Sequence, residues 1–272
     1  MESGAMSRYK PRGGVDTVSR PDHGGRQRME PKPKMTLDRV ASRFGVASRM
    51  DSRKAIVAGR MKVNGRTVRD PDIWVNPETD TFLLDGQKLK PARKRYLLFY
   101  KPKGVITSHG DPAGRKTIYD FLGDDNKWVS PVGRLDKDTS GLLMLTNDTK
   151  FADFITSPES EVPKTYMVKT NALLSDEVIA QLSAGVEMKR GDFAHPVSVM
   201  RREDRGKYTW LDIVLAEGKN REVRRMMEAV GFVVLKLVRT QIGPLTLDGL
   251  QVGKWRELTA EEMSALRKMR KR

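Results

Sequence analysis

The chain of 272 residues carries 51 lysines and arginines against 35 aspartates and glutamates, which leaves a net charge of +16 and a pI of about 10.0. It contains no cysteine, which excludes disulfides and thiolate chemistry, and its three histidines lie too far apart in the sequence for a local metal site. No apolar run reaches the roughly 20 residues of a membrane span and no secretory signal opens the chain, so these quantities favour a cytoplasmic, two-domain protein that binds nucleic acid.

Residues 1–34 combine scattered charges with prolines and glycines and contain few apolar side chains. Such a segment cannot bury enough apolar surface to offset the cost of ordering, so we predict a disordered basic tail. A short helix is expected between an N-cap at Thr36 and a stop at Gly45. Its apolar residues at helical spacing are Leu37, Val40, Ala41 and Phe44.

A second helix is predicted from Ser48 to Gly59, and two hairpins follow it. The first turns at Asn64-Gly65, a dipeptide that suits a tight hairpin turn, and the second lies in DTFLLDGQKL, residues 80–89. Basic side chains gather on the helix pair and its exit: Arg43, Arg49, Arg53, Lys54 and Arg60. This order of elements resembles the S4 RNA-binding domain over residues 35 to about 90, and the resemblance implies that the basic face contacts RNA phosphates. Taken alone, the same charges could equally form a solvated helix face.

The segment KLKPARKR, residues 88–95, is basic, contains proline and has little to bury. We therefore expect residues 35–94 to form the first domain with its linker, and residues 95–260 to form the second. Strands are predicted at YLLFYK, YMVKT, YTWLDIVLA and FVVLKLV, and helices near residues 148–155, 174–185 and 220–231. Because these elements lack a regular βαβ alternation, we predict an α+β domain with a mixed, largely antiparallel sheet. A last helix starts at a capping box of Thr259 and Glu262, and residues 261–272 form its basic end.

An acidic pair, Asp136 and Asp138, stands inside GRLDKDTSGLLMLTND, residues 133–148 of this basic chain. The Asp-x-Asp spacing occurs in metal-dependent phosphatases, where the carboxylates work with magnesium after a continuous apolar strand. Pro131, Gly133 and Arg134 interrupt such a strand here. An isolated aspartate in this setting would instead cap a turn.

The whole segment closely resembles the catalytic signature of the ribosomal RNA pseudouridine synthases of the RsuA/RluB group, whose members commonly carry an N-terminal S4 domain. Three further segments match in order and spacing: YKPKG at 100–104, PKTY at 163–166 and EGKNREVRRMM at 217–227. The resemblance spans residues 35 to 258, with a departure at SPESEV, where related sequences often have histidine and more basic side chains. It implies isomerisation of uridine to pseudouridine in ribosomal RNA, with no cofactor and no metal.

By this resemblance, Asp136 is the carboxylate that works on the ribose while the C1′–N1 bond breaks and C1′ rejoins the base at C5. Whether it attacks C1′ or abstracts the 2′ proton is left open. Tyr166 is implied to stack on the flipped uracil and to assist a proton transfer at C5. A carboxylate that loses its solvent beside RNA phosphates needs a cation to stay charged, and the family comparison puts this cation at Arg224, with Arg225 as the alternative.

Contacts to RNA phosphates are expected from basic residues in and near these segments: Lys101, Lys103, Arg134, Lys137 and Arg225. Residues 110–120, GDPAGRKTIYD, look like the large-subunit branch of the group. This likeness implies a single uridine in a hairpin of the large ribosomal RNA as the target, and we expect a monomer. Two rival functions remain: an S4-type ribosome-assembly factor that binds RNA without catalysis, and the metal-dependent phosphatase.

Overall fold

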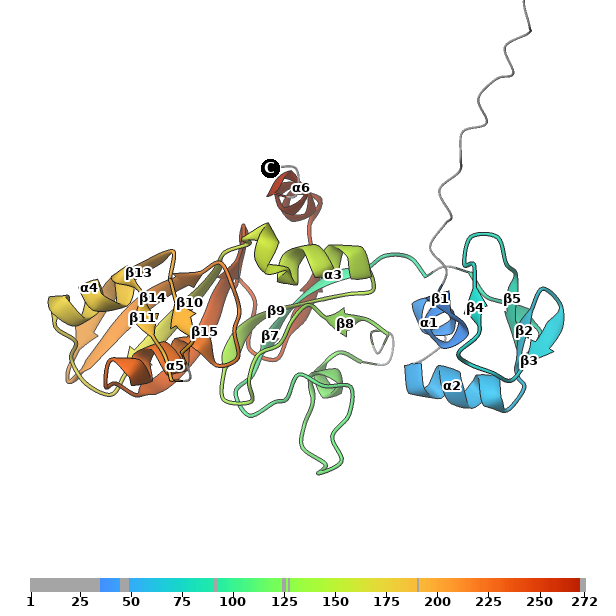
Figure 1. Ribbon diagram of the computed structural model, residues 1–272, viewed down its shortest axis with the longest axis horizontal. Helices are drawn as coiled ribbons and strands as arrows, with labels where there is room; N and C mark the ends of the chain where they lie inside the picture. Colours follow the sequence, from blue (N-terminus) through green and yellow to red (C-terminus); the bar gives the residue numbers. More distant parts are fainter. Residues whose placement is uncertain are drawn as a thin grey trace, which may run out of the picture. The chain divides into compact units, whose positions relative to one another are not determined.

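The computed structural model describes residues 35–44, 49–90, 92–123, 126, 128–189 and 191–269 (Figure 1). The predicted basic tail at 1–34, the predicted helix limits at Gly45 and Ser48, and residues 270–272 of the predicted basic helix end lie outside these residues. No helix in the described ranges is both long enough and apolar enough to cross a membrane.

The N-terminal module, residues 35–90, contains both predicted helices and both predicted hairpins. Its helices are α1 (Leu37–Arg43) and α2 (Arg49–Val57), and β1 (Met35–Thr36) pairs with β4 (Trp74–Val75). A second sheet has the order β3 (Arg66–Val68), β2 (Met61–Val63), β5 (Phe82–Leu84), β6 (Gln87–Lys88). Asn64 and Gly65 take φ angles of 49° and 81°, as a two-residue hairpin turn requires. Apolar side chains of both helices and this sheet meet in one core around Ile56 and Phe82.

The second domain is built on a mixed sheet with the strand order β13, β14, β10, β15, β9, β7, β17. The bounds are β13 (Ser198–Arg205), β14 (Tyr208–Leu215), β10 (Lys164–Thr170), β15 (Val234–Ile242), β9 (Ser140–Thr146), β7 (Tyr96–Lys101) and β17 (Trp255–Glu257). Short strands β8 (Ser130–Pro131) and β16 (Leu245–Thr246) pair with β9 and β15, and β11 (Val186–Glu187) pairs with β12 (Phe193–Ala194). Only β9 and β15 run parallel among these described pairs, which confirms the predicted largely antiparallel sheet.

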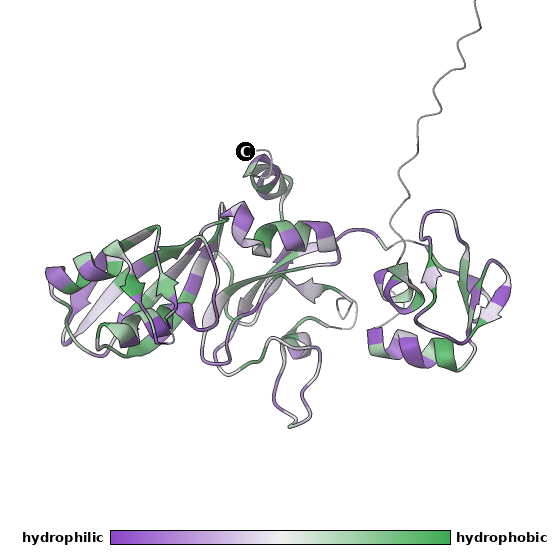
Figure 2. Ribbon diagram, in the orientation of Figure 1, coloured by the Kyte–Doolittle hydropathy of each residue, from purple (hydrophilic) through white to green (hydrophobic). Residues whose placement is uncertain are grey.

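Helices pack on this sheet in two groups. Helices α4 (Asp176–Ala184) and α5 (Glu222–Ala229) share a core with β10, β14 and β15 through Leu182 and Met226. Helices α3 (Thr149–Thr156) and α6 (Ala260–Met269) share another with β7 and β9 through Phe151 and Leu266. Hydrophobic and hydrophilic residues alternate along α3 and α4, as this one-sided packing requires (Figure 2). Because Leu266 is fully buried, the second domain extends through α6, beyond the limit at residue 260 that the sequence suggested.

Among the longer strands of the second domain, β9 and β13 are missing from the sequence-based prediction, as are the short strands β8, β11, β12, β16 and β17. β13 is an edge strand of mostly charged residues, SVMRREDR, so its alternation of apolar and polar residues is weak. β9 follows directly on the acidic segment, and it begins at a crowded point. Gly141 has φ of 114°, and a β-carbon there would lie 2.2 Å from the carbonyl oxygen of Arg239. Glycine therefore allows β9 to lie close to β15, and this contact fixes the start of β9.

Candidate active site

Asp136 lies on the loop of residues 132–139 between β8 and β9, which we name the Asp136 loop. The ammonium group of Lys101, at the end of β7, binds the backbone of this loop. It donates to the carbonyl oxygens of Asp136 at 3.0 Å and Thr139 at 2.8 Å, and to Pro102 at 3.1 Å. Lys101 is fully buried. The predicted contact of Lys101 with an RNA phosphate is therefore wrong, because its three N–H groups are used inside the fold.

The carbonyl oxygens between these two anchors are also held. The Gly104 amide donates to the carbonyl oxygen of Lys137 at 2.7 Å, and the guanidinium of Arg224 donates to that of Asp138 at 3.1 Å. The Thr139 amide closes a turn onto the Asp136 carbonyl at 3.1 Å. Donors thus hold successive carbonyls of the loop from 136 to 139, which fixes the backbone that carries the Asp136 carboxylate.

The Lys101 ammonium also places a positive charge next to the Asp136 loop. Burial lowers the pKa of Lys101 to about 8, while the negative charges of Asp136 and Asp138 act in the opposite direction. At neutral pH most of the lysine is still charged. A buried positive charge therefore lies directly behind the Asp136 loop.

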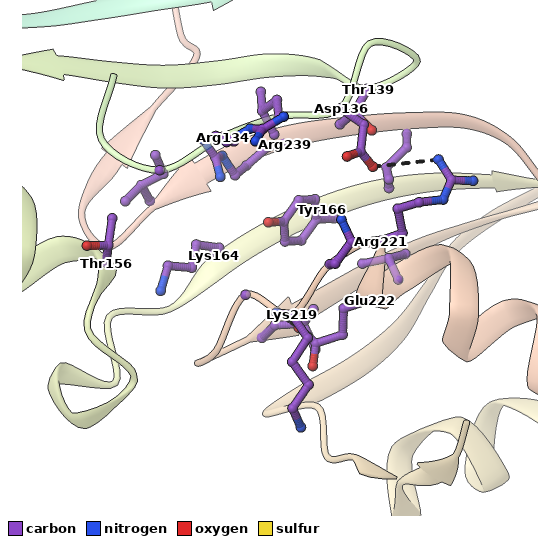
Figure 3. A pocket seen from close by; sticks show the side chains of 18 of the residues that line it. Arg134, Asp136, Thr139, Thr156, Lys164, Tyr166, Lys219, Arg221, Glu222 and Arg239 are labelled. Carbon is purple, nitrogen blue, oxygen red and sulfur yellow. Dashed lines mark hydrogen bonds and ion pairs between the residues drawn. The ribbon is translucent and has the colours of Figure 1, made fainter. Parts of the chain in front are cut away.

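The Asp136 carboxylate faces Arg221, at the start of α5. The two side chains form an ion pair, with Arg221 Nη1 3.8 Å from Asp136 Oδ2, and both remain partly exposed, at 45% and 35% respectively (Figure 3). Arg221 adopts the left-handed conformation, with φ of 50° and ψ of 33°, at the N-cap position of α5. This conformation is uncommon for a residue with a β-carbon, and it marks a position that the surrounding fold must hold.

The two arginines that the sequence comparison indicated, Arg224 and Arg225, bind other groups than the Asp136 carboxylate. Arg224 donates to the carbonyl oxygens of Val234 at 3.0 Å and Asp138 at 3.1 Å, so it binds the backbone next to Asp136. Burial lowers the pKa of Arg224, and the nearby charge of Arg221 lowers it further. Arg225 pairs with Asp192 and donates to the Lys189 carbonyl at 3.2 Å. The ion pair to the Asp136 carboxylate thus comes from Arg221, which the prediction did not include.

Tyr166 lies on β10 and lines the same pocket as Asp136 (Figure 3). The pocket has a volume of about 410 Å³, in the range of small-ligand sites. Its walls come from the Asp136 loop, from β10 and β15, and from residues 218–223 before and within α5. Tyr166 also packs against two of the apolar cores, which holds its ring in place. The structure therefore brings Asp136 and Tyr166, the predicted catalytic carboxylate and stacking residue, to one cavity.

Positive side chains outnumber carboxylates in this pocket. The cations that line it are Arg134, Lys164, Lys219, Arg221 and Arg239, and the carboxyl groups are Asp136 and Glu222. Burial raises the pKa of Glu222 to about 7, and a hydrogen bond with Glu217 raises it too. Near neutral pH, part of the Glu222 population is uncharged. The pocket as a whole is therefore suited to a negatively charged ligand.

The other residues of the second domain that were predicted to contact phosphates differ in whether their side chains are already paired within the protein. Lys103, Arg134 and Lys137 are exposed, and Arg134 borders the pocket. Arg225 is already engaged with Asp192. The first three side chains can thus reach a bound RNA, whereas Arg225 would have to leave its carboxylate.

In the N-terminal module, most of the predicted RNA-binding residues are paired with carboxylates. Asp38 accepts Arg49 Nε at 2.7 Å and Arg53 Nη1 at 3.0 Å, and Arg53 also pairs with Asp72 at 2.7 Å. Arg60 binds Asp85 at 2.5 Å, and Lys54 lies 3.8 Å from Asp51. Arg43 is exposed at the end of α1. Arg49, Arg53 and Arg60 thus support the fold of the module first, and Arg43 and Lys54 are its freer cations.

Five charged pocket residues were not in the sequence-based prediction. Lys219, Arg221 and Glu222 lie in the matched segment EGKNREVRRMM, and Lys164 lies in PKTY, so their segments were found but not their roles. Arg239 lies in a strand, VLKLVRTQI, that reads as an ordinary amphipathic sequence. Burial of a strand arginine in the wall of this pocket has no local signal.

Within the ranges that the structure describes, no group of three or more histidine, cysteine, aspartate and glutamate side chains could hold a metal ion. Asp138, the second carboxylate of the Asp-x-Asp pair, is exposed and does not line the pocket. The two carboxylates therefore do not face a common point in this cavity.

Known proteins are similar to this chain over most of its length. Residues 95–229 match the RNA pseudouridylate synthase family. An uncharacterized RNA pseudouridine synthase of Aquifex aeolicus is 41% identical over 85% of this chain and 92% of its own length. Ribosomal large subunit pseudouridine synthase B of Bacillus subtilis is 39% identical over 85% of this chain and 95% of its own. The Yersinia pestis protein of the same name is 35% identical over 86% of this chain and 75% of its own length.

A solved structure has the same fold over nearly its whole length. The crystal structure of a pseudouridylate synthase superposes with a TM-score of 0.62 at 29% sequence identity, and the match covers 85% of this chain and 99% of that one. This structural similarity extends well beyond residues 95–229, the segment that matches the family.

Proposed function

Because the chain belongs to the RNA pseudouridylate synthase family and is a pseudouridine synthase, we propose that its target is a single uridine in large-subunit ribosomal RNA. The relatives from Bacillus subtilis and Yersinia pestis, named as large-subunit enzymes, support this target. The segment GDPAGRKTIYD supports it as well. There Asp111 accepts the Arg115 amide at 2.9 Å and pairs with its guanidinium at 2.6 Å, which gives the loop a defined shape to present to a hairpin.

The observation that carries the proposed site is the Asp136 carboxylate, held on a fixed loop in a pocket of cations beside Tyr166. When the C1′–N1 bond breaks, positive character develops at C1′ of the ribose, and a carboxylate stabilises it. Asp136 can attack C1′ or abstract the 2′ proton, and both routes need the ionised form. Arg221 pairs with the carboxylate itself, and Lys101 places a positive charge behind the backbone that carries it.

The other catalytic roles divide between three side chains. Tyr166 offers its ring to the flipped uracil, and its phenol can assist the proton transfer at C5. Arg221 pairs with the Asp136 carboxylate, and Arg224 positions the loop through the Asp138 carbonyl. The role that the sequence indicates for Arg224 is thereby shared between two arginines one helical turn apart.

We also propose that the N-terminal module, residues 35–90, is an S4 RNA-binding domain that anchors the substrate, while residues 95–269 carry the chemistry. Its hairpins and basic helix pair support this division. Arg43 and Lys54 are the side chains to test, because replacing them leaves the Asp38 network intact. Arg43→Ala with Lys54→Ala should weaken RNA binding and lower the dependence of log Kd on log salt by about one for each phosphate that is no longer bound. An unchanged salt dependence would contradict an anchoring role for this helix face.

The catalytic assignment is tested with Asp136→Asn. The amide keeps the shape but not the charge, so isomerisation should fall by roughly 10³-fold or more while RNA affinity stays within about twofold. RNA tritiated at C5 of uridine releases tritium when C1′ bonds to C5, which gives a direct assay. Asp153→Asn, on the outer side of α3, is the matched control. Substantial tritium release by Asp136→Asn would sink the assignment.

The target is tested by mapping pseudouridine across both ribosomal RNAs in cells with and without the protein. We expect one position in the large-subunit RNA to lose its modification. A missing modification only in the small-subunit RNA would overturn the target but not the catalytic site. A non-catalytic assembly factor, the rival function, would leave every pseudouridine in place and would tolerate Asp136→Asn. The cytoplasmic location and the monomeric state stay predictions of the sequence.

A further inference from the structure

Arg239 is a buried arginine in the wall of the pocket with an unused donor. It lies on β15, opposite Tyr166 of β10, and only 5% of it is exposed. Its Nε donates to the Leu142 carbonyl oxygen at 2.8 Å, which fixes the guanidinium against β9. Its Nη2 is buried and has no hydrogen-bond partner among the described residues. A buried guanidinium N–H without an acceptor is costly, so the site is organised around a group that the protein itself does not provide.

A second buried cation adds to the positive charge at this end of the pocket. Lys164, the first residue of β10, is 8% exposed, and its ammonium donates to the Ala216 carbonyl oxygen at 3.2 Å. Burial lowers the pKa of Lys164, and the like charge of Arg239 lowers it further. No carboxylate within the described ranges forms an ion pair with Lys164 or Arg239. The missing partner is therefore an anionic oxygen of the ligand.

The arrangement around Tyr166 indicates which oxygen this is. In Figure 3, Asp136 and Arg221 lie on one side of the Tyr166 ring, and the hydroxyl end of that ring points to the side with Lys164, Arg134 and Arg239. A uracil that stacks on Tyr166 with its ribose at Asp136 extends its far edge toward Arg239. The carbonyl oxygen at C4 of uracil, across the ring from N1, lies on that edge.

We propose that Arg239 is a further catalytic residue, which donates a hydrogen bond to a uracil carbonyl oxygen and stabilises the uracil anion as it leaves C1′; this role rests on the proposed active site around Asp136. When the C1′–N1 bond breaks, its electron pair goes to N1, and the negative charge spreads over the carbonyl oxygens. The ring then turns, C5 bonds to C1′, and the proton lost from C5 is balanced by one gained at N1. A charged donor in a buried site stabilises such an anion far more than solvent would.

The test compares Arg239→Gln and Arg239→Lys with the wild-type enzyme on two RNAs, one with uridine and one with 5-fluorouridine at the target. Arg256→Gln, which removes an arginine paired with Glu262 outside the pocket, is the matched control. Single-turnover rates, RNA affinity and thermal unfolding are measured for each protein. The nucleosides of digested RNA, separated by chromatography, report how much target has rearranged.

We expect Arg239→Gln to lower the single-turnover rate on uridine by about 10²-fold with RNA affinity within about twofold. Arg239→Lys, which keeps the charge, should lose less. Fluorine stabilises the uracil anion without help from the protein, so the loss caused by Arg239→Gln should be clearly smaller on 5-fluorouridine. Arg239→Lys keeps the inference testable if the glutamine variant does not fold.

Three results would overturn the inference. Equal losses on both RNAs would mean a structural role, and weaker binding with a reduced salt dependence and an unchanged rate would mean that Arg239 holds a phosphate. A normal rate for both Arg239 variants would show that neither role exists. If Asp136→Asn is inactive in the same assay, any of these outcomes refutes only the role of Arg239, whereas an active Asp136→Asn refutes the proposed site as well.

Discussion

The arginines of the N-terminal module and the buried cations in and behind the pocket are held in opposite ways. In the module, Asp38 is completely buried and accepts hydrogen bonds from the Thr36 hydroxyl, the Arg39 amide and the guanidinium groups of Arg49 and Arg53. In the second domain, Lys164 and Arg239 of the pocket wall and Lys101 and Arg224 behind the Asp136 loop donate to backbone carbonyl oxygens. Carboxylates neutralise the first group, and neutral carbonyls leave the second group charged.

The directions of the pKa shifts express the same difference. Burial raises the pKa of Asp38, but hydrogen bonds from Thr36, Arg49 and Arg53 outweigh this effect and lower the pKa to about 2. In and behind the pocket, burial lowers the pKa values of Lys101, Lys164 and Arg224. The protein therefore stabilises charge in the module and concentrates uncompensated positive charge at the pocket. An RNA substrate carries the negative charge that the pocket lacks.

The largest effect is expected when the carbonyl-held support of the Asp136 loop is removed. Lys101→Met should lower isomerisation by about 10³-fold, because the carbonyls of Asp136 and Thr139 lose their donor and the loop no longer holds the carboxylate in place. RNA affinity should change little, since Lys101 does not reach the surface. Tritium release and filter binding measure the two quantities, with Lys150→Met, at an exposed position of α3, as control. A large loss of affinity at a normal rate would restore Lys101 as a phosphate contact.

The matching change in the module should affect stability rather than chemistry. Asp38→Asn leaves Arg49 and Arg53 without their buried carboxylate and should destabilise the module by about 3 kcal/mol. Hydrogen exchange of the amides in α1 and α2 measures this local loss of stability. Asp51→Asn, at an exposed carboxylate of α2, is the control. Since the folded pKa of Asp38 is about 2 and thus below its unfolded value, its contribution is present above about pH 4 and is lost as the pH falls toward 2. Unchanged exchange in Asp38→Asn would mean that the network adds nothing to stability.

Arg221 and Arg224 separate contact with the carboxylate from support of the loop. Arg221→Gln should lower the rate by about 10- to 100-fold without loss of thermal stability, because Arg221 is half-exposed and contacts the Asp136 carboxylate. Arg224→Gln should lower the rate and the thermal stability together, because two backbone carbonyls lose a buried donor. If the two variants behaved alike, the division of roles between them would be wrong.

The smallest effect concerns Glu222 and depends on pH. Its folded pKa of about 7 lies above the unfolded value, so its neutral form favours folding at low pH, and stability should decline as the pH rises from about 4.5 through 7. Glu222→Gln should match the wild type near pH 5 and exceed it by about 1–2 kcal/mol at pH 8, since the amide never ionises. Urea unfolding at both pH values measures this, with Glu228→Gln on the exposed side of α5 as control. A wild-type stability that is flat between pH 5 and 8 would contradict the shift.

Patterns that act over a few residues are visible in the amino-acid sequence itself. The capping box of α6 forms as predicted, since Glu262 accepts the Thr259 amide at 2.8 Å and donates its own amide to the Thr259 hydroxyl at 3.2 Å. The Asn64-Gly65 turn and the helices α3, α4 and α5 follow equally local rules of φ preference and apolar spacing. The motif around Asp136 likewise indicates the family without knowledge of the fold.

The tertiary structure alone decided which charged side chains meet. Lys101 reaches a carbonyl 35 residues away, Arg224 one 86 residues away, and Arg239 one 97 residues away. No local pattern marks a lysine in KPKG as buried or separates Arg221 from Arg224, because burial and pairing depend on which strands become neighbours in the sheet. The sequence by itself therefore determined most of the local elements, the family and the carboxylate that we propose as the reactive group. The fold decided the cations around that carboxylate, since electrostatic contacts act through space and not along the chain.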